Sequence, residues 1–195
     1  MNDPALYRHL VDAAEAGYPA LASEIARAYL RRLPESFAVL LHYGIALQEL
    51  ARHDEAEDAL LQAERLAAGP ERALVRRQRG SLAEARGRDD AAVDLYRQAI
   101  ELAPEDPRGY VALGSLLLRR GRSDEALRAL RRAVTCTDGE VEEAYCHLGV
   151  ALRSRGEYLE ALGCFRAALE LDPDYPLAQE GLADVEHVLF QFPEG

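Results

Sequence analysis

Three cysteines and five histidines are the side chains in this sequence best suited to bind a metal or attack a substrate. Cys146 and His147 are adjacent, and Cys164 follows about one helix later. Adjacent residues on a helix point about 100° apart, so this pair makes a poor set of ligands for one ion. The cysteine spacing matches no zinc site, and reduced thiols in a cytoplasm are the simpler interpretation. The histidines are scattered along the chain, at His9, His42, His53, His147 and His187.

Motifs that carry catalysis or hold a cofactor are also missing from the sequence. There is no phosphate-binding glycine loop ending in Lys, no HExxH, no CxxC and no GxSxG. All 23 basic residues are Arg, which excludes Schiff-base chemistry by lysine. We therefore expect a protein that is not an enzyme and that uses neither a cofactor nor a metal. The arginine-only, alanine-rich composition favours a bacterial source with a G+C-rich genome.

The distribution of charge argues against nucleic acid as a partner. The net charge is −11, whereas general binding to nucleic acid depends on neutralising phosphates. Residues 71–135 hold 14 Arg against 10 acidic residues, and residues 136–195 hold 3 Arg against 13 acidic residues. This asymmetry would let a basic middle segment attract the acidic end of another copy. No apolar run approaches the roughly 20 residues of a membrane helix. The early acidic residues do not resemble a secretion signal, so we expect a cytoplasmic protein without membrane insertion.

A repeat of about 35 residues organises nearly the whole chain. GEYLEALGCFRAALELDP, from Gly156 to Pro173, shares its Gly, paired Ala and closing Pro with GRDDAAVDLYRQAIELAP, from Gly87 to Pro104. Related segments begin at Gly17, Ala51 and Gly121. A fixed period in this range is typical of proteins that stack one supersecondary unit on the next.

Each repeat is predicted to contain two helices. In residues 142–175 the first helix places Tyr145, Leu148 and Leu152 on one face. Gly156 is suited to the turn that follows, and Pro173 ends the second helix. Small residues such as Gly149 let helix backbones pack closely.

The pattern resembles the tetratricopeptide repeat. Tyr145-x2-Leu148-Gly149-x2-Leu152, followed by Ala161-x3-Phe165 and Pro173, is similar to W-x2-L-G-x2-Y…A-x3-F…P. The resemblance implies an all-α, right-handed α-solenoid of about five helix-turn-helix units and a C-terminal capping helix, in a single domain spanning residues 1–195. The expected units are 3–36, 37–72, 73–106, 107–141 and 142–175, with the capping helix at 176–190.

Some units depart from this pattern. The first has Leu10 in place of a small residue, which suits a terminal cap. The second has Ala51 in place of Gly, and the third has Arg76 and Arg79 at two normally apolar positions. At the C-terminal end, Phe190 and Phe192 add more apolar surface than a helix needs if it only covers the last repeat. They either cover the last repeat, form a homodimer contact or fold in as a mimic of a ligand.

The resemblance also identifies the surface that meets a partner. In the family, positions 2, 5, 9 and 12 of each first helix line a concave groove that holds a peptide. We call the corresponding positions here the first-helix stripe. Its candidate binding residues are Tyr7, Val11, Leu41, Ile45, Gln48, Arg77, Ser81, Glu84, Arg108, Val111, Ser115, Leu118, Val150 and Arg153.

The stripe suggests which partner it binds. Its N-terminal part is apolar, as a contact surface often is, unless the first unit folds over it. Arg77, Arg108 and Arg153 have donors suited to a carboxylate, so an acidic segment or a chain terminus is one expected partner. Internal ion pairs with Glu84 or Glu143 are the alternative. We expect a protein-binding adaptor or scaffold, and the competing hypothesis is a self-assembling homo-oligomer joined through the C-terminal helix and the oppositely charged ends.

Overall fold

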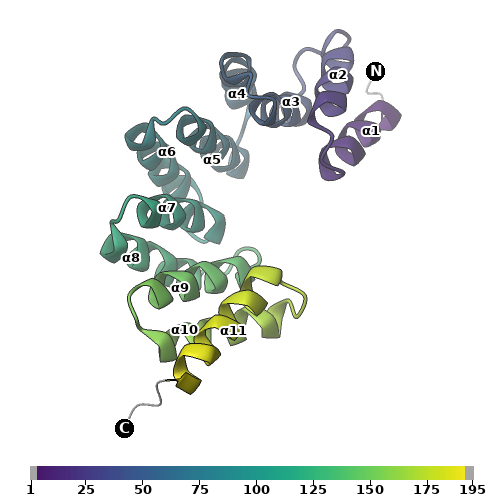
Figure 1. The fold of residues 1–195 in the computed structure, drawn as a ribbon. Helices are drawn as coiled ribbons and strands as arrows, with labels where there is room; N and C mark the ends of the chain where they lie inside the picture. The colour runs from purple at the N-terminus through teal and green to yellow at the C-terminus, as the bar shows by residue number, and fades with distance from the viewer. Residues whose placement is uncertain (1–3, 192–195) are drawn as a thin grey trace. The chain divides into compact units, whose positions relative to one another are not determined.

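The computed structural model describes residues 4–191, and within that range every regular element is an α-helix. The helices divide into two compact units, one ending at Leu102 and the other beginning at Ala103. Consecutive helices pair as hairpins within each unit (Figure 1). This confirms the predicted all-α solenoid of helix pairs, whereas a single domain over residues 1–195 stays a prediction. The first unit contains α1 (Pro4–Glu15), α2 (Pro19–Leu30), α3 (Phe37–Glu49), α4 (His53–Leu66), α5 (Pro70–Ala85) and α6 (Asp89–Leu102). The second contains α7 (Pro107–Arg119), α8 (Ser123–Ala133), α9 (Glu142–Ser154), α10 (Tyr158–Leu171) and α11 (Pro176–Gln191).

The turn inside each helix pair explains the recurring glycine. Gly156, after α9, has a φ of +79°, a left-handed conformation that costs little without a side chain. Its N–H donates to the carbonyl of Arg153, and the N–H of Glu157 donates to the carbonyl of Leu152, each at 3.0 Å. Ala51 adopts the same conformation with a φ of 57°. The turn therefore forms even where a Cβ makes it less favourable.

A glycine in the first helix of a pair makes room for a large residue in the second helix. A Cβ added at Gly149 would lie 2.8 Å from the ring of Phe165, far inside van der Waals contact. The same close approach occurs in four successive pairs, between Gly44 and Leu60, Gly80 and Tyr96, Gly114 and Leu130, and Gly149 and Phe165.

The first pair reverses this arrangement of sizes. Leu10 occupies the position of the glycine on α1, and Ala26 occupies the position of the large residue on α2. Both are fully buried and belong to one apolar cluster. At these two positions the first unit thus exchanges a large and a small residue within one apolar cluster, which keeps the packed volume similar to that of a glycine–leucine pair.

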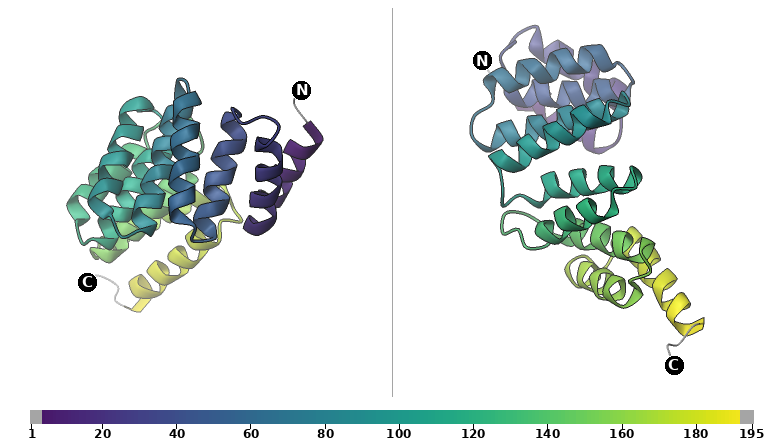
Figure 2. Two further views of the ribbon diagram at one scale, coloured as in Figure 1. Left: turned by 90° about the horizontal axis from the view of Figure 1, so that it is seen from above. Right: turned by 90° about the vertical axis from the view of Figure 1, so that its left-hand side faces the viewer.

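The helix α11 packs against α9 and α10, as the views in Figure 2 also show. Val185 is fully buried, and Gly181 lies against the ring of Phe165, 2.4 Å from an added Cβ. The predicted capping helix is therefore present. Phe190 does not cover the last repeat, because it is 85% exposed, and Phe192 lies outside the described residues. Among the described helices, none has the length and apolar character needed to cross a membrane.

Candidate functional site

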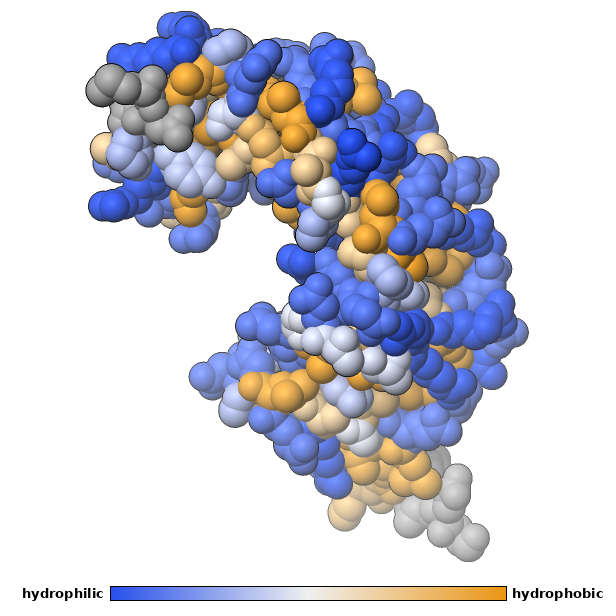
Figure 3. Space-filling model, turned by 180° about the vertical axis from the view of Figure 1, so that it is seen from behind, coloured by the Kyte–Doolittle hydropathy of each residue, from blue (hydrophilic) through white to orange (hydrophobic). Residues whose placement is uncertain are grey.

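The N-terminal part of the first-helix stripe is apolar and aromatic. On α1 and α3, Tyr7 meets the ring of His42 edge-on, with centroids 6.2 Å apart and an interplanar angle of 68°. Val11 and Ile45 are half-buried on the same two helices. Leu41 is only 7% exposed and belongs to the core of the first unit. The surface available to a ligand there is consequently formed by its half-buried neighbours. In Figure 3, apolar side chains also gather beside the N-terminal end of the described chain.

Hydrogen bonds fix the next part of the stripe, on α3 and α5. The Nε2 of Gln48 donates to the Oγ of Ser81 at 2.9 Å, which links the first helices of two successive repeats. The Oε1 of Gln48 is buried and has no partner within residues 4–191. The hydroxyl of Tyr96 donates to Glu84 at 3.2 Å. These side chains are thereby held in place before any ligand arrives.

A similar link joins α7 and α9 in the second unit. The Oγ of Ser115 lies 3.0 Å from the Nδ1 of His147, and the Nε2 of His147 lies 3.8 Å from the Oε1 of Glu143. Burial lowers the pKa of His147 below its ordinary value, although Glu143 opposes this shift. Leu118 and Val150 are half-buried against the apolar core of the second unit, to which Val111, 5% exposed, belongs.

Ser115 contacts His147, which lies near Glu143, and these three residue types are those of a hydrolase triad. A triad enzyme also needs N–H donors aimed at the oxyanion of its intermediate. Ser115 lies within α7, where backbone N–H groups bond to carbonyls one turn earlier. The geometry is therefore suited to positioning side chains between two repeats. Sequence reasoning missed this contact, because residues 115 and 147 belong to different repeats.

Two of the stripe arginines, Arg108 and Arg153, already have acidic neighbours. Arg108 donates to both carboxylate oxygens of Asp106, which also caps α7, at 2.8 and 3.1 Å. Arg153 forms an ion pair with Asp184 on α11. For Arg108 and Arg153 the ion pairs are thus formed with Asp106 and Asp184. Exposed pairs of this kind contribute only about 0–1 kcal/mol, so a partner carboxylate could replace them.

The thiols of α9 and α10 are poorly suited to chemistry. Burial raises the pKa of Cys146 and that of Cys164 to about 11 in each case, and thiols rather than thiolates are poor nucleophiles and ligands. Cys146 is fully buried, whereas the adjacent His147 contacts Ser115. In the described part of the chain, no three His, Cys, Asp or Glu side chains are grouped to hold a metal ion.

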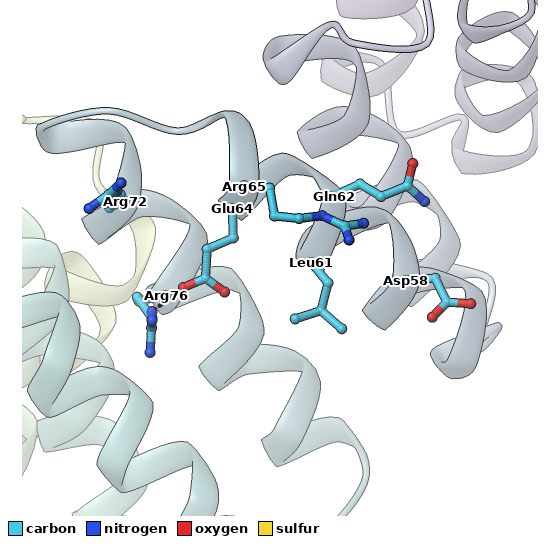
Figure 4. Close-up of a pocket in the computed structure, with 7 residues that line it drawn as sticks. All are labelled: Asp58, Leu61, Gln62, Glu64, Arg65, Arg72 and Arg76. Atoms are coloured by element: carbon cyan, nitrogen blue, oxygen red, sulfur yellow. Dashed lines mark ion pairs between the residues drawn. The ribbon is translucent and has the colours of Figure 1, made fainter.

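A cavity of about 610 Å³ lies in the first unit, away from the stripe, and sequence reasoning missed it. It is formed by α4 and the start of α5 (Figure 4). Beside it, Arg79 on α5 donates to Glu57 and Glu64 at 2.7 and 2.6 Å, and Arg76 pairs with Glu64. The two arginines noted as departures from the repeat pattern therefore join α4 to α5. The cavity is lined by Asp58, Leu61, Gln62, Glu64, Arg65, Arg72 and Arg76.

Comparison with known proteins identifies the family. One tetratricopeptide repeat model matches residues 142–175, and another matches residues 44–107 and 77–141. The chain belongs to the tetratricopeptide repeat family.

Individual relatives match part of the sequence or the fold. Human tetratricopeptide repeat protein 7A is 36% identical over 99 residues, which are 51% of this chain and 11% of the relative. The structure of yeast Tom70 has a TM-score of 0.79 at 20% identity, and the match covers 90% of this chain and 39% of the Tom70 chain. The structure of YrrB, described as a tetratricopeptide repeat protein with an unusual peptide-binding site, has a TM-score of 0.56 at 19% identity. The match covers 88% of this chain and 87% of the YrrB chain. This chain spans about a tenth of the curated relative's length, and the structural matches support the fold alone.

Proposed function

We propose that this chain is a non-catalytic adaptor that binds a segment of another protein along its first-helix stripe. The family is one of protein-interaction repeats, and YrrB, a structural neighbour, has a peptide-binding site. The observation that carries the proposal is the pair of cross-repeat contacts, Gln48 with Ser81 and Ser115 with His147. Because each contact holds the stripe residues of its own unit in one arrangement, that part of the receptor loses little conformational freedom when a partner binds.

The residues of the stripe suggest a division of roles. Tyr7, Val11 and Ile45 would contact apolar side chains of the partner on α1 and α3. Arg108, whose side chain is 57% exposed, would exchange Asp106 for a carboxylate of the partner. On α5, Arg77 would likewise bind a carboxylate of the partner. An acidic segment or a chain terminus therefore remains the expected ligand. Bacterial origin and cytoplasmic location stay predictions based on composition.

The test is affinity capture with three baits: the wild type, an Arg77→Glu/Arg108→Glu variant and an Arg88→Glu/Arg128→Glu control. The control changes one exposed arginine in each unit and alters net charge equally. All three baits should show the same helicity by circular dichroism. We expect a protein that the wild type and the control retain and the stripe variant loses, and that rebinds the wild type when purified. Equal retention by all three baits contradicts binding through the stripe.

Self-association is a second candidate, and exposed apolar residues at the end of the second unit favour it. Phe190 and Leu159 are 85% and 65% exposed, next to a hollow of about 220 Å³ that Leu159 and Leu189 line. Figure 3 shows apolar surface beside the C-terminal end of the described chain. Sedimentation of the wild type and of Phe190→Ser tests this function. A dimer that the substitution dissociates supports it, and a wild type that remains monomeric at high concentration excludes it.

A further inference from the structure

The cavity between α4 and α5 is distinct from the first-helix stripe. Four of its residues, Asp58, Leu61, Gln62 and Arg65, follow one another along one face of α4 at helical spacing. A smaller hollow of about 260 Å³ adjoins the same helix and shares Gln62 and Arg65. Together the two hollows leave this face of α4 accessible from both sides. None of the cavity residues belongs to the stripe.

The charges of the cavity are not balanced by internal pairs. Of its two acidic residues, Glu64 is already engaged by Arg76 and by Arg79, and Asp58 is exposed on α4, seven residues before Arg65. Arg65 is exposed and has no hydrogen bond or ion pair to any residue of 4–191. Arg72 donates its Nε to the carbonyl of Ala67 at 3.1 Å, which orients the guanidinium and leaves its two terminal nitrogens available. Two positive groups therefore face the cavity without an acidic partner.

Apolar surface accompanies these arginines. Leu61 lines the cavity and Leu66 lines the smaller hollow, and each is 38% exposed. A guanidinium recognises carboxylates through paired N–H donors, and an exposed leucine gains from covering by an apolar side chain. The volume of about 610 Å³ is within the usual range of about 300–1,000 Å³ for binding pockets.

From these observations we propose that the cavity binds an acidic segment of a partner protein, with carboxylates on Arg65 and Arg72 and an apolar side chain on Leu61. Charge complementarity identifies this occupant. The chain as a whole carries −11, so an acidic ligand is repelled from most of the surface and gains only where arginines are unpaired. This second surface goes beyond the proposed function and would let one chain hold two protein segments at once.

The test measures fluorescence anisotropy of a labelled random copolymer of glutamate and leucine, which offers carboxylates at many spacings. The cavity variant is Arg65→Glu/Arg72→Glu. The matched control, Arg31→Glu/Arg88→Glu, changes two exposed arginines of the same unit and the same total charge. We expect the cavity variant to bind at least about tenfold more weakly, since two charge-assisted contacts are lost, and the control to bind like the wild type.

Three results would overturn the inference. Equal weakening in both variants would show a general effect of charge, and unchanged binding in the cavity variant would show that the probe binds elsewhere. Displacement of the copolymer by citrate or inorganic phosphate at equal charge concentration would assign the site to small anions. An Arg77→Glu/Arg108→Glu variant keeps the two proposals separate. If it alone loses the copolymer, the stripe is supported and the cavity is not.

Discussion

The exchange of large and small residues in the first repeat can be transferred to another repeat. Leu130 is fully buried, and a Cβ added at Gly114 would lie 2.6 Å from its Cγ. Gly114→Leu alone therefore overpacks the contact, at a cost of about 1–3 kcal/mol or more. Leu130→Ala alone leaves a cavity and costs about 2–5 kcal/mol. The double variant reproduces the arrangement of Leu10 and Ala26.

The prediction concerns the coupling between the two substitutions. Because the double variant conserves the packed volume, its loss of unfolding free energy should be about 1.5 kcal/mol or less, well below the sum of the single losses. Urea denaturation followed by circular dichroism measures all four proteins of the cycle. A double variant as unstable as the sum of the singles would refute the view that the first repeat is a size exchange across one contact.

Three further predictions concern the second unit. Gly181→Ala should lower the unfolding free energy by about 1–3 kcal/mol because its Cβ would meet Phe165. Gly163→Ala, whose Cβ would have nothing within 4 Å, should raise the unfolding free energy by about 0.5–1 kcal/mol. Urea denaturation measures both changes, and equal effects of the two substitutions would contradict the packing of Gly181 against Phe165. Burial lowers the folded-state pKa of His147 below 6.5, so the unfolded state takes up the proton first. Stability should therefore fall as pH falls through and below 6.5, and less steeply in His147→Asn, as denaturation at several pH values checks. Cys146 should resist iodoacetamide in the folded protein and react in urea, as mass spectrometry would show; rapid labelling of the folded protein would contradict its burial.

The sequence predicted the helix pairs well because the repeat carries local information. Gly156 marks a left-handed turn through its φ preference, and the period of the small residues marks close helix packing. Ala51 forms the same turn, so the pattern remained readable where one residue departed from it. The family and the all-α solenoid were predicted correctly for these reasons.

Contacts between repeats were less predictable. Arg153 pairs with Asp184, 31 residues away. Ser115 contacts His147, which belongs to the next repeat. Which side chains meet there depends on how one helix pair is rotated on the next, and the repeat pattern does not specify that rotation. For the same reason the sequence marked Arg76 as unusual without indicating that it lines a cavity.

The exposure of single side chains was also uncertain from sequence. In the last helix, Val185 is fully buried. Phe190 continues the apolar sequence but follows Leu189 around the helix by about 100° and points into solvent. The stripe residues remain a prediction about function, although Leu41 and Val111 prove to be largely buried in the core.

The most direct test of the central claim is site-specific photocrosslinking in cell extract. In separate variants, a photoreactive amino acid replaces Tyr7 or Leu118 on the stripe. In the control variants it replaces Leu21 or Arg128, which lie on the exposed face of the second helix of a pair. Binding through the stripe predicts that the same partner protein is crosslinked from Tyr7 or Leu118 and not from either control position. Crosslinks that arise only from the control positions, or that join only copies of this chain, would contradict it.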